Sequence, residues 1–315
     1  MPHDRRRKNI HIKKNKNKKS RKKKKGIKKM NRNRKKVDFV TLIYVNGANP
    51  NGDPAALNDP RTDLDGYGVI SRECMARKMR NRLQEMGNPI FVQTEGAETD
   101  GYRSLEERFW ETMKEEIGQK PEKAGKTALT EKAKALWQDV RLFGQVFAFK
   151  GGGDASFPVR GALTVNYARS VCPVQIEEYG ITKSVNGCQK DDGKKASDRM
   201  GTRKMVRSGL YVMRGSINGL LSEKNGVTED DVAAVKEALR TLFLNDASAA
   251  RPDGSMEVVK VFWFDHGCQN GKYSSAKVFR TVDVKPLVDD PLYIDDYQIN
   301  YKPLEGLDAE VIEGY

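Results

Sequence analysis

"VDFVTLIYV" (residues 37–45) runs directly into "NGANPNGDPAALNDPR" (46–61), and these two stretches together decide the fold. The first is almost entirely apolar or β-branched, a pattern that predicts a buried strand. The second is rich in Asn-Gly and X-Pro steps, which fix a rigid turn. A core strand therefore ends at a stiff corner, which stands ahead of the basic run "RECMARKMRNR" (72–82).

A basic helix is predicted after this corner. Ser71 is a suitable N-cap, and Gly87 with Pro89 beyond it ends the helix near Met86. The apolar stripe at helical spacing consists of Met75, Met79, Leu83 and Met86. Four cations lie off this stripe, with Arg77 and Arg80 on the opposite face and Lys78 and Arg82 on its flanks.

The remaining pattern mixes helices and strands. Thr228 opens a helix with an apolar stripe, and strand-like runs occupy residues 162–167, 209–213, 257–264 and 276–284. In the first of these runs Leu163, Val165 and Tyr167 alternate, as the residues on one face of a strand do. The sequence therefore predicts an α+β sheet domain.

The charge of the chain is unevenly distributed. The 315 residues carry a net charge of +14, but residues 1–36 contain 20 Lys or Arg and one acid, Asp4, a balance of +19. This leaves −5 for residues 37–315. The basic tail (1–36) cannot form a core and is predicted to be disordered. Two interpretations remain open. The first is a nucleic-acid arm that ignores sequence, and the second, which is favoured, is a misassigned start or a cloning artefact with Met30 as the true initiator.

Several kinds of site are excluded by residue type. The four cysteines (Cys74, Cys172, Cys188, Cys268) include no close pair of the kind a zinc ribbon needs. Residues 37–315 hold one histidine, His266, so a two-histidine ribonuclease mechanism is not expected there. We therefore expect no catalytic residues, no metal and no cofactor. No apolar run approaches the ~20 residues of a membrane span and no secretory signal is present, which predicts a cytoplasmic protein without a membrane partner.

One long segment fits no regular element. Residues 180–208 are polar and Gly-rich, and long insertions of this kind are usually functional or disordered. The stretch from Arg199 to Ser222 contains no acid. Its cations are Arg199, Arg203, Lys204, Arg207 and Arg214.

A combination of motifs now points to one family. In chain order these are "NPNGDPAALNDPR", "GYGVISRECMARKMRN", "QDVRLFG", "PVRGALTVNYARS", "ITKSVN", "RMGTRKMVRSGLYVMRGSIN", "NDASAAR" and "DDYQI". From about Val37 to about Ile299 the chain resembles the CRISPR-associated backbone subunit of type I surveillance complexes (Cascade), most closely the type I-C form. Any one motif alone is a weak signal, but "NPNGDP", the basic helix and "DVRxFG" in this order are specific.

The resemblance implies the fold, the partners and the activity. It implies a modified ferredoxin-like (RNA-recognition-type) palm over 37–315, with inserted helices and an extended thumb hairpin at about 180–208. It also implies copies that stack head to tail along a CRISPR guide RNA, pair a target DNA strand through that guide, join other Cascade subunits and perform no catalysis. Sequence-blind binding of a guide needs cations and backbone amides directed at phosphates. The predicted RNA-binding residues are Asn49, Asn51, Gly52, Arg77, Lys78, Arg80, Arg82, Arg160, Arg199, Arg203, Lys204 and Arg207.

A second hypothesis from another class stays open. Related backbone subunits of other CRISPR types cut target RNA with a loop aspartate, so an endoribonuclease is the alternative function. The candidate aspartates are Asp53, Asp59, Asp63 and Asp65. Asp53 would repel a phosphate, so we interpret it as a brace of the turn.

Overall fold

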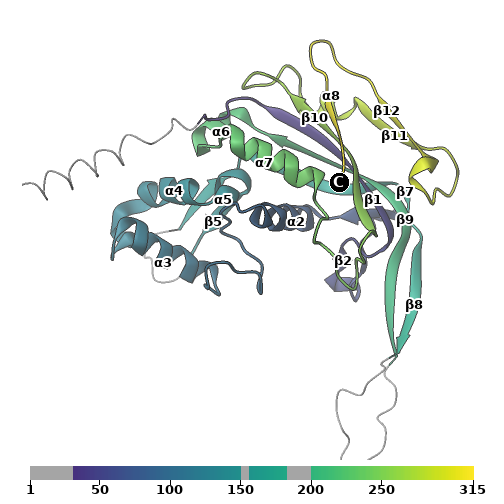
Figure 1. Ribbon diagram of the computed structural model, residues 1–315, viewed down its shortest axis with the longest axis horizontal. Coiled ribbons are helices and arrows are strands. Elements are labelled where there is room, and N and C mark those ends of the chain that lie inside the picture. The colour runs from purple at the N-terminus through teal and green to yellow at the C-terminus, as the bar shows by residue number, and fades with distance from the viewer. Residues whose placement is uncertain (1–30, 150–155, 183–199) are drawn as a thin grey trace, which may run out of the picture. The chain divides into compact units, whose positions relative to one another are not determined.

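The structure is a computed structural model that describes residues 31–149, 156–182 and 200–315. Residues 33–315 form one unit, whose centre is a seven-stranded antiparallel sheet (Figure 1). Six strands follow one another across it in the order β13 (Glu310–Glu313), β10 (Met256–Asp265), β1 (Val37–Ala48), β9 (Met200–Ile217), β7 (Leu163–Pro173) and β4 (Tyr67–Ile70). The seventh, β8 (Ile176–Thr182), pairs with the first part of β9.

The other elements surround this sheet. Three short strand pairs are β2 (Gly52–Asp53) with β3 (Asp59–Pro60), β5 (Gly144–Phe147) with β6 (Phe157–Arg160), and β11 (Val282–Pro286) with β12 (Tyr297–Tyr301). The α-helices are α2 (Arg72–Glu85), α3 (Leu105–Ile117), α4 (Gly125–Leu136), α5 (Gln138–Phe143), α6 (Gly219–Asn225), α7 (Glu229–Arg240) and α8 (Ser275–Phe279). Short 3₁₀ turns occupy η1 (Pro54–Ala56), η2 (Pro121–Ala124) and η3 (Ile294–Asp296).

Strand β1 confirms the prediction for residues 37–45 and continues to Ala48. Its side chains alternate between two covered faces: Phe39 and Ile43 belong to the core under the helices, and Val40 and Leu42 belong to the core on the other side. Because both faces are covered, the strand is a nearly continuous apolar run.

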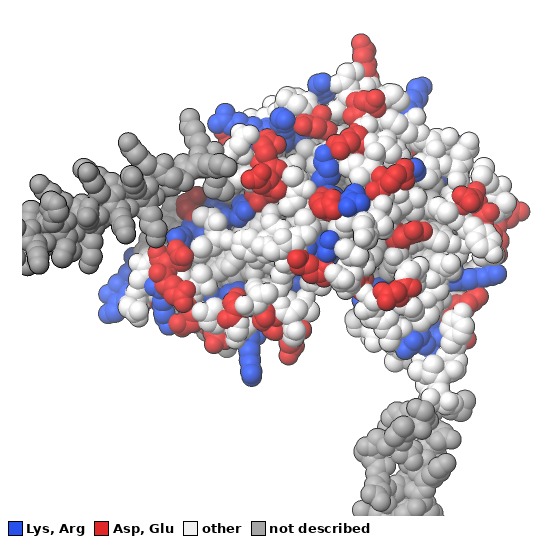
Figure 2. Space-filling view, in the orientation of Figure 1, with Lys and Arg blue, Asp and Glu red and all other residues white. Residues whose placement is uncertain are grey.

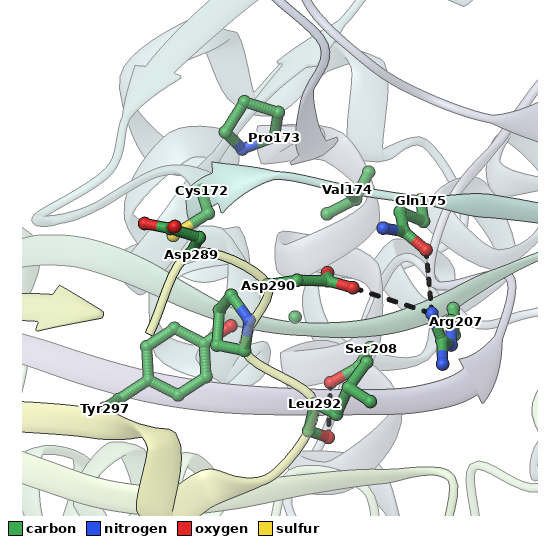
Figure 3. Close-up of a pocket in the computed structure, with 12 residues that line it drawn as sticks. Cys172, Pro173, Val174, Gln175, Arg207, Ser208, Asp289, Asp290, Leu292 and Tyr297 are labelled. Carbon is green, nitrogen blue, oxygen red and sulfur yellow. Dashed lines mark hydrogen bonds and ion pairs between the residues drawn. The ribbon is translucent and has the colours of Figure 1, made fainter. Parts of the chain in front are cut away.

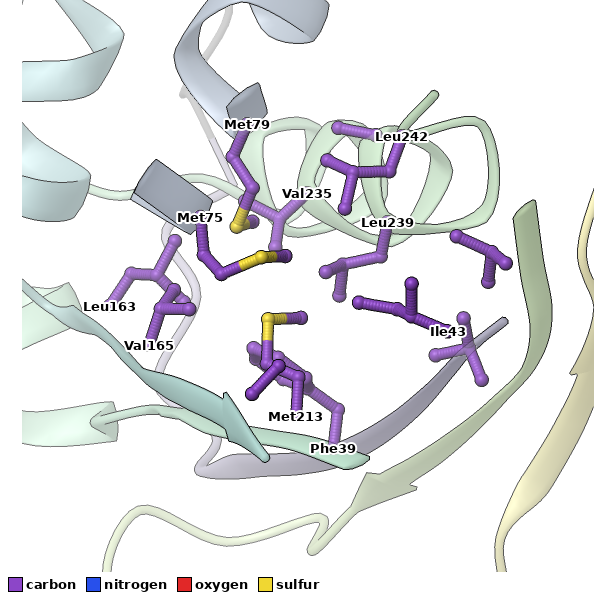
Figure 4. Packing of buried hydrophobic residues seen from close by; sticks show 14 of the residues in the cluster. Phe39, Ile43, Met75, Met79, Leu163, Val165, Met213, Val235, Leu239 and Leu242 are labelled. Atoms are coloured by element: carbon purple, nitrogen blue, oxygen red, sulfur yellow. The ribbon is translucent and has the colours of Figure 1, made fainter. Parts of the chain in front are cut away.

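One face of the sheet is covered by α2 and α7, as Figure 4 shows for the side chains between them. The predicted cap and stripe of α2 are confirmed, since Ser71 Oγ accepts the Cys74 N–H at 3.2 Å and Met75, Met79 and Leu83 are buried. Thr228 is the N-cap of α7 and forms a capping box with Asp231, which confirms the predicted start of this helix. The opposite face is covered by α8 and the β11–β12 pair.

An aromatic cluster holds a second, helical layer together. Phe91, Phe109, Trp137 and Phe147 are buried between α3, α4, α5 and the β5–β6 pair. The ring centroids of Phe91 and Trp137 lie 4.6 Å apart. Aromatic pairs at such distances add to the stability that their burial provides.

Two local predictions are wrong. Residues 276–284 do not form one strand, because Ser274 caps the short helix α8 and only residues from Val282 onward are extended. The alternation in β7 is broken by a bulge between Val165 and Ala168, where two residues of β7 lie opposite one residue of β9. The extra residue shifts the alternation by one, so Ala168 is buried and Tyr167 is 55% exposed.

The last residues of the predicted tail do not fit the prediction of disorder. Residues 1–30 lie outside the described part of the chain, but Asn33 is buried and its N–H donates to Val227 O at 2.8 Å. Lys36 Nζ lies 3.1 Å from the buried carboxylate of Asp38. Residues 33–36 therefore belong to the folded unit.

None of the described helices is long and apolar enough to cross a membrane.

Candidate nucleic-acid interface

The corner at 46–61 is built by hydrogen bonds within the chain. Asn51 Oδ1 accepts the Ser71 N–H at 2.8 Å, which joins the corner to the start of α2. Asn49 is buried, and its amide donates to Asn58 O at 2.6 Å. At Gly52 a Cβ would lie 2.9 Å from Asn58 O, so this position needs glycine for the approach of the chain to itself. Asn49, Asn51 and Gly52 thus have structural roles in the described fold.

A groove of about 530 Å³ opens beside this corner, between α2, β6 and the start of β7. Four of its lining residues are arginines and one is an acid, Glu73. The arginines are Arg72, Arg77, Arg80 and Arg160. On the described surface seen in Figure 2, acidic and basic side chains are interspersed, so the groove is a local concentration of positive charge in a mildly acidic body.

Two of the groove arginines are fixed by partners of their own. Arg80 Nε lies 3.2 Å from the carboxylate of Asp139, which is buried, and its guanidinium stacks on Phe143 at 4.4 Å from the ring centroid. Arg77 donates to Val92 O at 2.8 Å. Burial lowers the pKa of both arginines, and for Arg77 the neighbouring Arg80 lowers it further. The two guanidinium groups are therefore positioned by the fold at a site where a further anion would be favourable.

The other two groove arginines are open. Arg72 is the first residue of α2 and Arg160 the last residue of β6, and both are exposed. Among the described residues neither side chain has a hydrogen bond or an ion pair. An exposed guanidinium of this kind can bind a phosphate in a bidentate manner without breaking an existing contact. Arg160 is among the predicted RNA-binding residues and Arg72 is not, although Arg72 opens the basic run of α2.

Lys78 and Arg82 point away from the groove. Lys78 is 5% exposed, and its ammonium group binds Asp246, which also pairs with Arg251 at 3.0 Å. Burial lowers the pKa of Lys78, and the charge of Asp246 opposes that shift. Arg82 donates to Thr241 Oγ1 and pairs with Glu85, both at 2.8 Å. These two predicted site residues tie α2 to α7 and to the loop that follows it, and we leave them out of the candidate interface.

The range predicted for the thumb (180–208) overlaps an antiparallel arm formed by β8 and the first residues of β9. Its register runs from Ile176 opposite Val206 to Thr182 opposite Met200. The arm therefore starts four residues before the predicted position 180. Residues 183–199, including the predicted site residue Arg199, lie outside the described part of the chain.

The arm cations differ in their contacts. Lys204 binds Asp59 of the corner at 2.6 Å, and this bond raises the pKa of Lys204. Arg207 binds Gln175 at 2.9 Å and lies 3.7 Å from Asp290 (Figure 3). These last contacts border a cavity of about 280 Å³ at the arm root, where Ser208 Oγ donates to Leu292 O at 2.8 Å. Arg203 has no hydrogen bond or ion pair to another described residue.

Three of the four loop aspartates of the alternative hypothesis have side-chain partners. Asp53 accepts the Ala55 N–H at 3.0 Å and pairs with Arg61, as expected for a brace of the turn. Asp59 binds Lys204, as described above. Asp63 pairs with Arg169 at 2.8 Å, and this bond is the main cause of its lowered pKa. Asp65 is exposed. Within the described ranges, no three His, Cys, Asp or Glu side chains are grouped so as to hold a metal ion.

His266 has a structural position. It is fully buried, and its Nε2 lies 2.8 Å from Asp38 Oδ2. Its Nδ1 accepts the Lys272 N–H at 2.9 Å, so the proton of the neutral ring lies on Nε2 and points to Asp38. Both ring nitrogens are thus used inside the fold.

The "QDVRLFG" motif links the groove to the helical layer. Asp139 accepts the N–H groups of Phe91 and Val92, and Arg141 pairs with the buried Asp231 at 2.6 Å. Burial opposes the ionisation of Asp231, but the bonds from Arg141 outweigh it and its pKa is lowered. At Gly161 a Cβ would lie 2.2 Å from Leu142 O, so this glycine lets the end of α5 and the groove wall touch.

The chain belongs to a family of CRISPR-associated proteins. The family described as "CRISPR-associated protein Cas7" matches residues 35–302, which is more than half of the chain. A protein of Haloferax volcanii named "CRISPR-associated protein Cas7" is 26% identical over 212 residues, which are 61% of this chain and 60% of that protein. The chain thus spans somewhat less than two thirds of the length of this curated relative.

Two solved structures are similar to the chain at lower identity. One, titled "CRISPR RNA-guided surveillance complex, pre-nicking", is 15% identical with a TM-score of 0.47, covering 73% of this chain and 78% of its own. The other, "CRISPR RNA-guided surveillance complex", is 18% identical with a TM-score of 0.43, covering 73% and 68%.

Proposed function

We propose that this chain is a backbone subunit of a CRISPR surveillance complex and binds the guide RNA without regard to its sequence. The observation that carries the proposal is the groove with four arginines, two of which are open. Membership of the Cas7 family gives this groove its context. The partners that we propose are the guide RNA, a target DNA strand paired to it, further copies of this chain and other subunits of a type I complex, most like type I-C.

The groove is suited to phosphates more than to bases. Its cations are guanidinium groups, which bind phosphate oxygens in a bidentate manner. Arg77 and Arg80 are held in place by Val92 O and Asp139, and such fixed donors cost little entropy when a strand binds. Contacts to phosphates position a strand but do not read its sequence. A guide whose sequence is read by base pairing needs a protein surface of this kind.

The strand order supports a ferredoxin-like palm. In chain order β1, α2, β7, β9, α7 and β10 form a β-α-β-β-α-β sequence, and the strands lie side by side as β10, β1, β9 and β7. The arm made by β8 and β9 continues from the central strand β9, which supports its assignment as the thumb. The bond between Lys204 and Asp59 links this arm to the corner beside the groove.

The proposal is tested by what the protein carries from its own host. Purification followed by sequencing of bound RNA should yield guide RNAs, and the protein should elute as an assembly of several copies. Recovery of a monomer with no RNA enriched over a mock purification would overturn the proposal.

A second arm of the same experiment addresses catalysis. We propose that the subunit is not a nuclease, so guide-bound protein incubated with complementary RNA and Mg²⁺ or Mn²⁺ should leave that RNA intact. Cleavage that disappears on substitution of one of Asp53, Asp59, Asp63 or Asp65 would instead support the endoribonuclease hypothesis. Because binding and cleavage are measured separately, either part can fail alone.

A further inference from the structure

The bulge in β7 creates a feature on the face of the sheet opposite α2. Asn166 and Tyr167 both lie across from Arg214 of β9, because the pairing steps from Val165–Gly215 to Ala168–Met213. Without the extra residue, alternation would bury Tyr167 beside Val165. With it, two consecutive side chains are exposed on one face. Bulges often re-aim a side chain next to a functional site.

Arg214 is the unusual member of this group. It is half-buried, and no hydrogen bond or ion pair to another described residue accompanies it. Burial lowers the pKa of Arg214, and the nearby Tyr167 acts in the opposite direction. A guanidinium removed from water without a carboxylate partner is costly, and an external anion would relieve that cost.

Arg169, the next arginine on the same face, has the partners within the chain that Arg214 lacks. Its guanidinium lies 3.6 Å from the ring centroid of Tyr67 and 2.8 Å from Asp63. Arg169 is thus both stacked and paired within the chain. Arg214 and Tyr167 provide the same two kinds of group, a cation and an aromatic ring, with the ring left open to solvent.

The pair lies close to the end of the groove. Thr164 and Val165 line the groove. Tyr167 lies three residues beyond Thr164 on the same strand, a distance of about 10 Å at 3.2–3.4 Å per residue. The neighbouring strand β4 pairs with β7 only from Ala168 onward, so residues 163–167 form an open edge of the sheet. An RNA strand that leaves the groove can cross this edge without meeting another β-strand of the described fold.

We propose that Tyr167 and Arg214 form a nucleotide subsite for the guide RNA, with a base stacked on the Tyr167 ring and the adjoining phosphate bound by Arg214. This inference rests on the proposed function, since it continues the path of the strand that the groove holds. Base stacking on an aromatic ring tolerates any sequence. The subsite therefore adds affinity without adding sequence preference.

The test measures the affinity of the full chain for a labelled oligouridylate and for an abasic strand of equal length, at several salt concentrations. Tyr167→Leu should weaken oligouridylate binding by roughly tenfold with an unchanged salt slope, and should leave binding of the abasic strand unaffected. Arg214→Gln should weaken binding of both strands and reduce the salt slope by about 0.7. Tyr293→Leu and Arg280→Gln, two exposed positions elsewhere, are the matched controls and should change neither.

The outcomes separate this subsite from the groove. If Arg72→Gln with Arg160→Gln weakens binding while Tyr167→Leu and Arg214→Gln do not, the subsite is overturned and the groove stands. Equal weakening of both strands by Tyr167→Leu would also overturn it, because stacking requires a base. Urea unfolding of each variant shows whether a loss of affinity comes from a loss of folding. If Tyr167→Leu does not fold, the test uses Tyr167→Phe, which keeps the ring and should bind like the parent. A loss of affinity in the folded Tyr167→Phe variant would count against stacking.

Discussion

The two sides of helix α2 carry similar charges and have different roles. On one side Lys78 pairs with Asp246, and Arg82 donates to Thr241 and pairs with Glu85. The contacts with Asp246 and Thr241 hold α2 against α7 and the loop that follows α7. On the other side Arg72 is open, and Arg77 and Arg80 line a groove. A basic run in a sequence is thus not a measure of free positive charge, because the fold decides which cations already have partners.

The largest expected effect comes from the buried side. Asp246→Ala would leave the buried Lys78 without its carboxylate, and loss of one partner of such a pair costs about 3–5 kcal/mol. Urea unfolding without RNA measures it. Asp253→Ala, an exposed aspartate a few residues on, should stay within ~0.5 kcal/mol of the parent. If Asp246→Ala lost less than about 1 kcal/mol, Lys78 would have to be a solvent-exposed cation and not a buried one that depends on Asp246.

Arg80 lies on the groove side but pairs with the buried Asp139, and its loss should give an intermediate effect. Arg80→Ala removes the cation from Asp139, which keeps its two backbone N–H donors from Phe91 and Val92. We expect a loss of about 1–3 kcal/mol in the free energy of unfolding. Arg72→Ala, at the open end of the same helix, should lose less than ~0.5 kcal/mol. If the two variants unfold alike, the distinction between fixed and open groove cations fails.

The smallest effect concerns the exposed pair of Asp63 and Arg169. The bond from Arg169 lowers the pKa of Asp63 below its ordinary 3.8 in the folded protein. The stabilisation is therefore complete above pH 3.8 and is lost as the pH falls through the lower folded-state pKa. Asp63→Asn should make the acid side of the stability–pH curve slightly flatter. A steeper curve in Asp63→Asn would contradict this assignment.

Much of the fold could be predicted from local pattern. The run of apolar residues at 37–45, the Ser71 cap and the methionine stripe each depend on neighbours in sequence, and the structure confirms them. The bulge at Tyr167 could not be predicted, because one extra residue in β7 is visible only against its partner strand β9. Helix α8 overlaps the residues that the short apolar pattern predicts as a strand (276–284), because the cap at Ser274 starts a helical turn there.

The candidate site was harder to predict than the fold. The sequence placed cations on α2 but not the distant carboxylates Asp246 and Asp139, which lie 168 and 59 residues from Lys78 and Arg80. Those partners decide which cations remain available. Arg72 and Arg214 are not among the predicted RNA-binding residues for the same reason, since the lack of a partner is a property of the folded chain.

The most direct test of the groove is the salt dependence of RNA binding by the Arg72→Gln, Arg160→Gln double variant. Loss of two phosphate contacts should weaken binding equally for unrelated guide sequences and lower the salt slope by about 1.4. The double variant Arg280→Gln, Lys302→Gln removes the same charge from exposed positions outside the groove and should bind like the parent. An unchanged affinity and salt slope for the groove variant, in a protein that unfolds normally, would contradict the account.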